Sequence, residues 1–180
     1  MAKDLSQTVD LTTKHTPTLR KPDSTDGAAI WALIKDCKPL DENSMYCNLV
    51  QADHFRDTCV LAELDGAVVG WISGHIRPDA DDTLFIWQVA VSSNARGLGL
   101  GSKMLDALLK RDVCADVSKL QTTITEDNDA SWALFRSFAN RHDGELTDEP
   151  YFVSEEHFDG YHDTEHMVTI NLAERMKKAA

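Results

Sequence analysis

Three glycines at alternate positions follow an arginine in the segment NARGLGLG, residues 94–101. An apolar segment, LFIWQVAV, precedes them, and apolar residues with helical spacing follow them. A loop that opens a helix in this way directs unpaired backbone N–H groups outward, and the helix dipole adds partial positive charge. The pattern predicts that this loop binds phosphate, with Arg96 adding a full positive charge at its edge.

The alternative for these glycines is a tight turn that binds no ligand. Two familiar nucleotide motifs do not match. A P-loop requires G-x-x-x-x-G-K-[ST], but the residue five positions after Gly97 is Ser102. A dinucleotide-binding turn requires G-x-G-x-x-G early in a parallel βαβ unit, whereas we expect the preceding strands to be antiparallel.

A second group of chemically capable residues lies in the segment GYHDTEHM, residues 160–167. Within it, HDTEH matches the H-x-x-E-H pattern of some zinc sites. That pattern binds zinc when both histidines lie on one face of a helix. Here it runs into the β-rich segment MVTINL, and residues four apart on a strand are separated by roughly 13 Å, too far to share one ion. We therefore predict no metal site.

The elements that must position these residues follow from hydrophobic periodicity and turn signals. We expect strands at residues 18–22, on both sides of the hairpin signal Asp65-Gly66, and at 83–92, 119–125 and 166–172. We expect helices at residues 23–37, 99–114 and 128–142, with a short one within 39–55, and a long acidic, aromatic loop over 142–166. The nearly continuous apolar run at 83–92 predicts a central strand covered on both faces. The fold class is α/β (α+β).

Composition narrows the functional classes. The chain has 180 residues and a net charge of −12, which argues against nucleic acid as a partner. It has no apolar run long enough for a membrane span, and its first residues lack the apolar core of a secretory signal, so we expect a cytoplasmic protein. The four cysteines show no C-x-x-C spacing and are expected to be buried thiols.

The strand WQVAV, the loop NARGLGLG and the later NDASWALF resemble the GNAT superfamily of N-acetyltransferases, over about residues 18–172. The resemblance implies a mixed, mostly antiparallel sheet of six to seven strands flanked by about four helices. It also implies acetyl-CoA as co-substrate, with the loop on its pyrophosphate and the strand WQVAV beside its pantetheine arm. The residues that this implies for coenzyme binding are Val89, Val91, Arg96, Gly97, Leu98, Gly99, Gly101, Ser102 and Asn128.

Two of the family's positions leave alternatives open. Asn128 corresponds to a coenzyme-contacting asparagine, but it could equally be a plain helix N-cap. Many members place a tyrosine seven residues later, as the acid that protonates the leaving thiolate, and this chain has Phe135 there. Another group or water then protonates the thiolate, or the thiolate leaves unprotonated.

Residues 20–55, 84–91 and 160–167 more specifically resemble the diaminobutyrate acetyltransferases of ectoine synthesis. This implies acetyl transfer to the 4-amino group of L-2,4-diaminobutyrate. The substrate-contacting positions would be Asp41, Tyr46, Trp87, His162 and Glu165, with catalysis expected from Glu165, His162 and Tyr46. Carboxylates suit the two ammonium groups of this substrate, and a tyrosine ring can hold a cation over its face.

Each of these positions also has a structural alternative. Asp41 could cap a helix, Tyr46 and Trp87 could be packing residues, and His162 could be structural. Three competing functions are an acetyltransferase for another amine, a noncatalytic coenzyme A-binding domain and a protein-directed acetyltransferase. We expect direct attack by the amine without an acetyl-enzyme, because no cysteine has an activating partner visible in sequence.

For domain organisation, we expect a polar leader over residues 1–17, one acetyltransferase domain over 18–172 and a charged tail over 173–180. The resemblance implies a homodimer, to which exposed apolar residues near YFVSEEHF could contribute.

Overall fold

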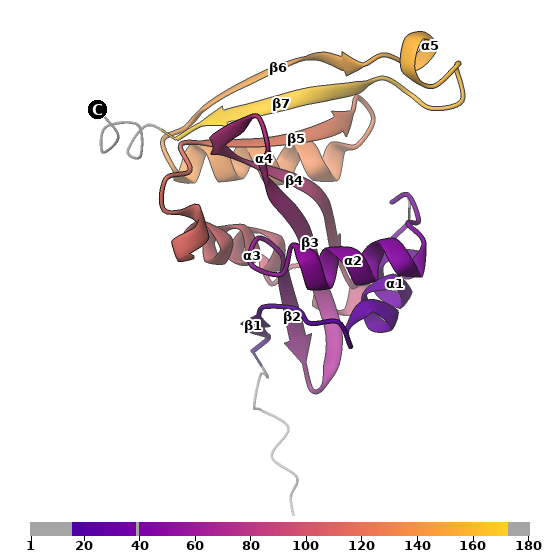
Figure 1. Ribbon diagram of the computed structural model, residues 1–180, viewed down its shortest axis with the longest axis vertical. Helices are drawn as coiled ribbons and strands as arrows, with labels where there is room; N and C mark the ends of the chain where they lie inside the picture. Colours follow the sequence, from indigo (N-terminus) through magenta and orange to yellow (C-terminus); the bar gives the residue numbers. More distant parts are fainter. Residues whose placement is uncertain (1–15, 39, 173–180) are drawn as a thin grey trace, which may run out of the picture.

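The computed structural model describes residues 16–38 and 40–172 (Figure 1). The strands in this part of the chain are β1 (Thr18–Arg20), β2 (Val60–Leu64), β3 (Ala67–Arg77), β4 (Ala80–Val91), β5 (Lys119–Thr125), β6 (Glu145–Phe152) and β7 (Glu165–Asn171). The α-helices are α1 (Gly27–Asp36), α2 (Met45–His54), α3 (Leu100–Leu109), α4 (Asp129–Arg141) and α5 (Ser154–His157).

All seven of these strands form one sheet in the order β1-β2-β3-β4-β5-β7-β6. Neighbouring strands are antiparallel except β4 and β5, which are parallel. The predicted mixed, mostly antiparallel sheet is therefore confirmed. The hairpin between β2 and β3 turns at Asp65 and Gly66, both with positive φ, as the Asp-Gly signal predicts.

The expectation of a long loop over residues 142–166 is wrong, because this segment contains β6 and the short helix α5. Strand β6 is the edge of the sheet, and nearly all of its residues are exposed. It therefore lacks the apolar alternation by which strands are recognised, and Pro150 is tolerated there because an edge strand has one unpaired side. The predicted leader and tail lie outside the described residues, apart from residues 16 and 17.

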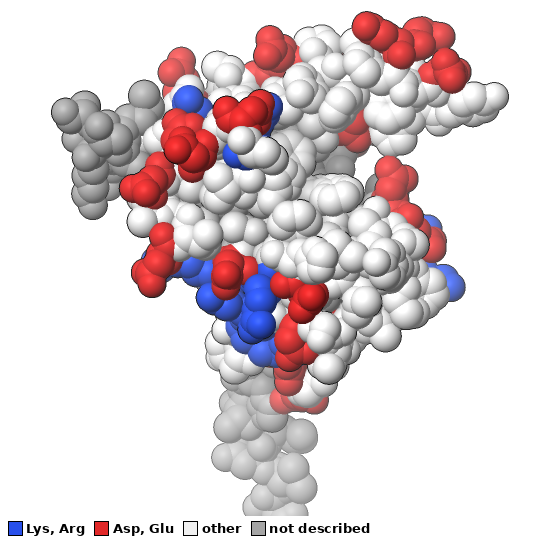
Figure 2. Space-filling model, in the orientation of Figure 1, with Lys and Arg blue, Asp and Glu red and all other residues white. Residues whose placement is uncertain are grey.

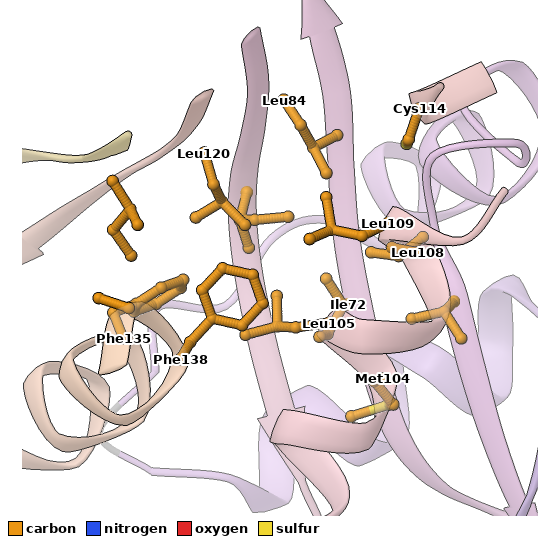
Figure 3. Packing of buried hydrophobic residues seen from close by; sticks show 14 of the residues in the cluster. Ile72, Leu84, Met104, Leu105, Leu108, Leu109, Cys114, Leu120, Phe135 and Phe138 are labelled. Atoms are coloured by element: carbon orange, nitrogen blue, oxygen red, sulfur yellow. The ribbon is translucent and has the colours of Figure 1, made fainter. Parts of the chain in front are cut away.

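Helices cover the sheet on both faces. Helices α3 and α4 pack against one face and helices α1 and α2 against the other, and each of these two pairs buries a separate apolar cluster. The larger cluster joins α3 and α4 to the sheet and includes Phe135 and Phe138 of α4 and Leu105 and Leu108 of α3 (Figure 3). The smaller cluster places α1 and α2 over Trp71 of β3 and the adjoining strands. The predicted apolar face of α3 is confirmed, since Leu105, Leu108 and Leu109 are buried.

The sheet opens between its two central strands. Parallel pairing of β4 with β5 covers only Thr83–Phe85 against Lys119–Gln121, and beyond it the strands diverge (Figure 1). On its other side β4 contains a β-bulge, because Ser73 pairs with Gln88 and Gly74 with Ile86, which leaves Trp87 as the extra residue. Gly74 is required there, since a Cβ would lie 2.7 Å from the carbonyl oxygen of Phe85. The opening positions the site described below.

The surface is acidic. Asp and Glu side chains are spread over the face shown in Figure 2, whereas most of its Lys and Arg side chains gather near β1 and β2. Among the helices of the described residues, none has both the length and the hydrophobicity that crossing a bilayer requires.

Candidate functional site

A cavity of about 460 Å³ fills the opening between β4 and β5. Figure 2 shows the molecule hollowed between the arm that carries α5 and the body that carries α1 and α2. The cavity receives side chains from four places: the segment before α2, the two diverging strands, the start of α4, and the segment that leads into β7. Its lining residues are Leu40, Asp41, Asn43, Trp87, Gln88, Val89, Thr122, Thr123, Ile124, Thr125, Asp127, Asn128, Ser131, Phe135, Gly160, Tyr161, His162, Asp163 and Glu165.

The bulge on β4 exposes Trp87 to this cavity. Trp87 is 50% exposed although it lies on a central strand. Its interpretation as a core residue is therefore wrong, and so is the expectation that β4 is covered on both faces at this point. A bulge redirects one side chain out of the regular alternation, and here it makes the indole a wall of the cavity.

Asp41, His162 and Glu165 form a charged group at the mouth of the cavity. Nε2 of His162 lies 3.2 Å from Oδ2 of Asp41 and 3.9 Å from Oε1 of Glu165. Asp41 belongs to the segment before α2, while His162 and Glu165 precede and begin β7. The structural alternative for Asp41 is wrong, because Ser44 caps α2 by accepting a hydrogen bond from the Cys47 amide. The contact therefore joins segments 121 residues apart.

Both ring nitrogens of His162 face oxygen acceptors. Nδ1 lies 2.8 Å from the carbonyl oxygen of Asp163, and Nε2 faces the Asp41 carboxylate. Only the doubly protonated ring can donate to both. The Asp163 carbonyl, followed by the Asp41 carboxylate, raises the pKa of His162 above its usual value. The arrangement therefore favours an imidazolium cation between two carboxylates.

The Glu165 carboxyl group is the buried member of this group. Its side chain is 19% exposed, and Oε2 has no hydrogen-bond partner among the described residues. Burial raises the pKa of Glu165, and the nearby His162 partly opposes that rise. A carboxyl group with a raised pKa that lines a cavity has the properties of a general base.

The glycine loop lies at the other end of β4. Gly97 and Gly99 have φ of 76° and 63°, a region that glycine enters without steric cost. Gly99 is the N-cap residue of α3, so no side chain caps the first amides of this helix. No atom lies within 4 Å of a Cβ placed at Gly99, so the space beside it is open. Among the described residues, the amide N–H groups of residues 97–102 donate to no other group. This cradle of amides at a helix N-terminus fits an anionic diphosphate.

The loop and the cavity adjoin one another. A Cβ added at Gly101 would lie 3.9 Å from Cγ1 of Val89, which lines the cavity. Asn128 also lines the cavity, and its Oδ1 accepts a hydrogen bond from the Ser131 amide at 3.1 Å, so it is an N-cap as well. Phe135, at the position of the family's tyrosine, lines the same wall and offers no proton.

The other predicted coenzyme residues lie outside the lining of the cavity. They are Val91 at the end of β4, Arg96, Gly97, Leu98 and Gly99 in the loop, and Gly101 and Ser102 in the first turn of α3. Their order along the chain leads from the cavity to the amide cradle.

Tyr46 is the predicted substrate residue that the cavity does not include. It lies in the first turn of α2 and is 74% exposed. This exposure contradicts its interpretation as a packing residue, and its contact with a substrate stays a prediction.

Neither a cysteine nucleophile nor a metal centre is evident in the described residues. None of the four cysteines lines the cavity, and burial raises the pKa of Cys59 to about 12. His162 contacts Asp41, whereas Nδ1 of His166, already on β7, lies 3.2 Å from Oδ2 of Asp148 on β6. Within residues 16–38 and 40–172, no group of three or more His, Cys, Asp or Glu side chains is arranged to hold a metal ion.

Several lining residues were not identified from the sequence. They are the amides of Asn43 and Gln88, the hydroxyl groups of Thr122, Thr123 and Thr125, and Ser131. The run of threonines in KLQTTIT predicts a strand with polar side chains. It does not reveal that one end of this strand, β5, is unpaired with β4.

Comparison with known proteins agrees with this geometry. Residues 27–139 match the family model described as "Acetyltransferase (GNAT) family". The L-2,4-diaminobutyric acid acetyltransferase of Vibrio parahaemolyticus is 49% identical over 155 residues, covering 85% of this chain and 84% of the relative. That of Methylotuvimicrobium alcaliphilum is 46% identical over 153 residues, covering 85% and 89%.

A solved structure extends the likeness to three dimensions. Diaminobutyrate acetyltransferase EctA from Paenibacillus lautus, in complex with L-2,4-diaminobutyric acid and coenzyme A, matches with a TM-score of 0.84 and 36% identity. The match covers 88% of this chain and 96% of that one. The chain therefore belongs to the GNAT acetyltransferases and, within them, to the family of the L-2,4-diaminobutyric acid acetyltransferases.

Proposed function

We propose that this chain transfers the acetyl group of acetyl-CoA to the 4-amino group of L-2,4-diaminobutyrate, giving N4-acetyl-L-2,4-diaminobutyrate for ectoine synthesis. The observation that carries the proposal is the cavity in the split sheet, with the charged group of Asp41, His162 and Glu165 at its mouth and the amide cradle beside it. The Paenibacillus lautus enzyme, whose structure this fold matches, is described with the same amino acid and coenzyme A.

The part of the site nearest α3 and α4 suits acetyl-CoA. The amides of residues 97–102 and the guanidinium of Arg96 would hold the diphosphate. The edge of β4 that faces away from β3, beyond Phe85, carries backbone groups that β5 does not pair. These groups are available to the pantetheine arm, and an N–H among Gln88–Val91 would polarise the thioester carbonyl. When bound, the coenzyme supplies an activated acyl group.

The other part of the site suits a short diamino acid. Diaminobutyrate carries two ammonium groups and one carboxylate at neutral pH. The carboxylates of Asp41 and Glu165 are partners for the ammonium groups, the His162 imidazolium is a partner for the carboxylate, and Trp87 forms a wall. Holding the substrate by its α-carbon end presents the 4-amine to the thioester, so positioning determines which nitrogen reacts.

Glu165 is the general base in this proposal, and His162 keeps its protons. The 4-ammonium group has a pKa near 10, so it must lose a proton before it can attack. The Glu165 carboxylate, which lines the cavity, takes that proton, directly or through water. The nitrogen lone pair then forms a bond to the carbonyl carbon, the carbon–sulfur bond breaks, and the nitrogen loses its second proton to water to give the amide. Because Phe135 cannot donate a proton, the thiolate leaves unprotonated or takes its proton from water.

A coenzyme A release assay over a small panel of amines tests the function. Diaminobutyrate should release thiol, whereas ornithine and lysine, one and two methylenes longer, should release it more slowly. NMR of the product should place the acetyl group on the 4-nitrogen. Equal rates with all three amines, or acetylation of the 2-nitrogen, would refute the anchoring at the α-carbon end. Turnover of an unrelated amine alone would favour a different small-amine acetyltransferase.

The protein is also proposed to act in the cytoplasm as a homodimer. Tyr151 and Phe152 are 40% and 39% exposed on the edge strand β6, which supports an interface at that edge. Light scattering after size-exclusion chromatography should give twice the chain mass of 20.0 kDa. A mass of one chain at micromolar concentration would refute the dimer.

A further inference from the structure

The buried side chain of Gln88 has no part in the mechanism above, although it lines the cavity. Gln88 directly follows Trp87 at the bulge of β4 and is 8% exposed. Its Nε2 donates a hydrogen bond to the carbonyl oxygen of Asp41 at 2.9 Å, and its Oε1 accepts one from Nδ2 of Asn43 at 3.2 Å. One amide thus attaches both ends of the segment from Asp41 to Asn43 to β4.

This segment depends on those hydrogen bonds for its place. Residues 41–44 form neither helix nor strand. The side chain of Asp41 is 84% exposed and meets His162 across the mouth of the cavity. An exposed carboxylate on an irregular segment is well placed only when the backbone beneath it is fixed, and the amide of Gln88 supplies two such attachments.

We propose that Gln88 is a positioning residue that sets the distance between the Asp41 carboxylate and the acyl-transfer strand β4. That distance determines how long a diamino acid the site accepts, because one end of the substrate is held at Asp41 and its reactive amine must reach β4. The inference rests on the proposed function and adds a determinant of its specificity.

The substitution Gln88→Met tests this, because methionine has a similar length and forms neither hydrogen bond. Each hydrogen bond lost is typically worth a factor of about two to ten. We expect KM for diaminobutyrate to rise about tenfold and the preference for diaminobutyrate over ornithine to fall at least about threefold, with KM for acetyl-CoA within about twofold of wild type.

The matched control is Gln121→Met on β5. Gln121 also makes two side-chain hydrogen bonds, accepting from Nη1 of Arg77 at 2.8 Å and donating to Oγ1 of Thr169 at 3.0 Å, but it does not line the cavity. It should leave both KM values and the substrate preference unchanged. A merely structural role for Gln88 predicts instead that the two variants behave alike.

A double substitution tests whether Gln88 acts through Asp41. In an Asp41→Ala background, Gln88→Met should change KM for diaminobutyrate less than about twofold. If Gln88→Met does not fold, Asn43→Ala removes one of the two bonds near the surface and should still lower the preference for diaminobutyrate. Wild-type turnover with an unchanged preference in these variants would overturn this inference alone. A wild-type chain that does not turn over diaminobutyrate would overturn the proposed function with it.

Discussion

Replacing Glu165 with glutamine tests the proposed base. Glutamine keeps the shape and the hydrogen-bonding oxygen but cannot accept the proton of the 4-ammonium group. Loss of a positioned general base typically lowers kcat by about 10²- to 10⁴-fold, and because the Glu165 carboxyl group lines the cavity we expect a loss within that range. KM for acetyl-CoA should stay within about twofold of wild type, since Glu165 belongs to β7 and is not one of the residues of the amide cradle. Steady-state thiol release gives both values.

The pH dependence gives a second readout of the same substitution. In wild type, kcat/KM should rise with pH through the pKa of Glu165, because the base must be ionised, and burial places that pKa above its ordinary value. Glutamine does not titrate, so this acid limb should be absent from the variant. Glu149→Gln, an exposed residue of β6 outside the cavity, is the control and should keep the limb.

Glu165→Gln should lower activity without lowering the stability of the folded protein at neutral pH. The folded-state pKa of Glu165 is raised above its unfolded value, so the stabilisation from its protonated form is fully present below the unfolded pKa. That stabilisation is lost as pH rises through the folded pKa. Glutamine does not ionise, so the variant does not lose this stabilisation as pH rises. Its Tm at neutral pH should therefore equal or exceed that of wild type. A kcat within twofold of wild type, with the acid limb intact, would refute the assignment of Glu165 as base.

Three further predictions concern the rest of the site and the core. Asp41→Asn should lower the pKa of His162, because the carboxylate that favours the cation is removed; NMR titration of the ring should show it, and an unmoved midpoint would contradict the pairing. Gly99→Ala places a Cβ at φ 63° and should cost about 1–2 kcal/mol of stability. It should raise KM for acetyl-CoA and not KM for diaminobutyrate. A rise in KM for diaminobutyrate alone would contradict the assignment of this loop to the coenzyme site. Phe138→Ala, at a fully buried position, should lower the free energy of unfolding in urea by about 3–5 kcal/mol, whereas a loss below about 1 kcal/mol would contradict its place in the core.

The sequence predicted most of the fold because its strands and helices carry strong local signals. The periodicity of α3, the Asp65-Gly66 turn and the apolar run of β4 each specify their element without tertiary context. Strand β6 could not be found in this way, because both of its faces are exposed and a proline interrupts it. Its pairing with β7 is a property of the sheet and not of its own residues.

The site was predictable where a residue type implied its chemistry and not where its place depends on register. The glycine loop and the acidic and histidine residues were identified from type and spacing, with the family resemblance assigning their roles. The exposure of Trp87 depends on a one-residue shift between β3 and β4, which no local pattern reveals. The role of Gln88 likewise needs the 47-residue separation from Asp41 to be closed by the fold.

The central claim is that the opening between β4 and β5 brings an amine held near Glu165 to an acyl group held by the loop at residues 96–102. A crystal structure of this chain with coenzyme A and L-2,4-diaminobutyrate tests it most directly. We predict the diphosphate on the amides of residues 97–102, the thiol end beside Val89, and the 4-amino nitrogen nearer to Glu165 than the 2-amino nitrogen is. Diaminobutyrate bound outside this cavity, or with its 2-amino group toward the thiol, would contradict the account.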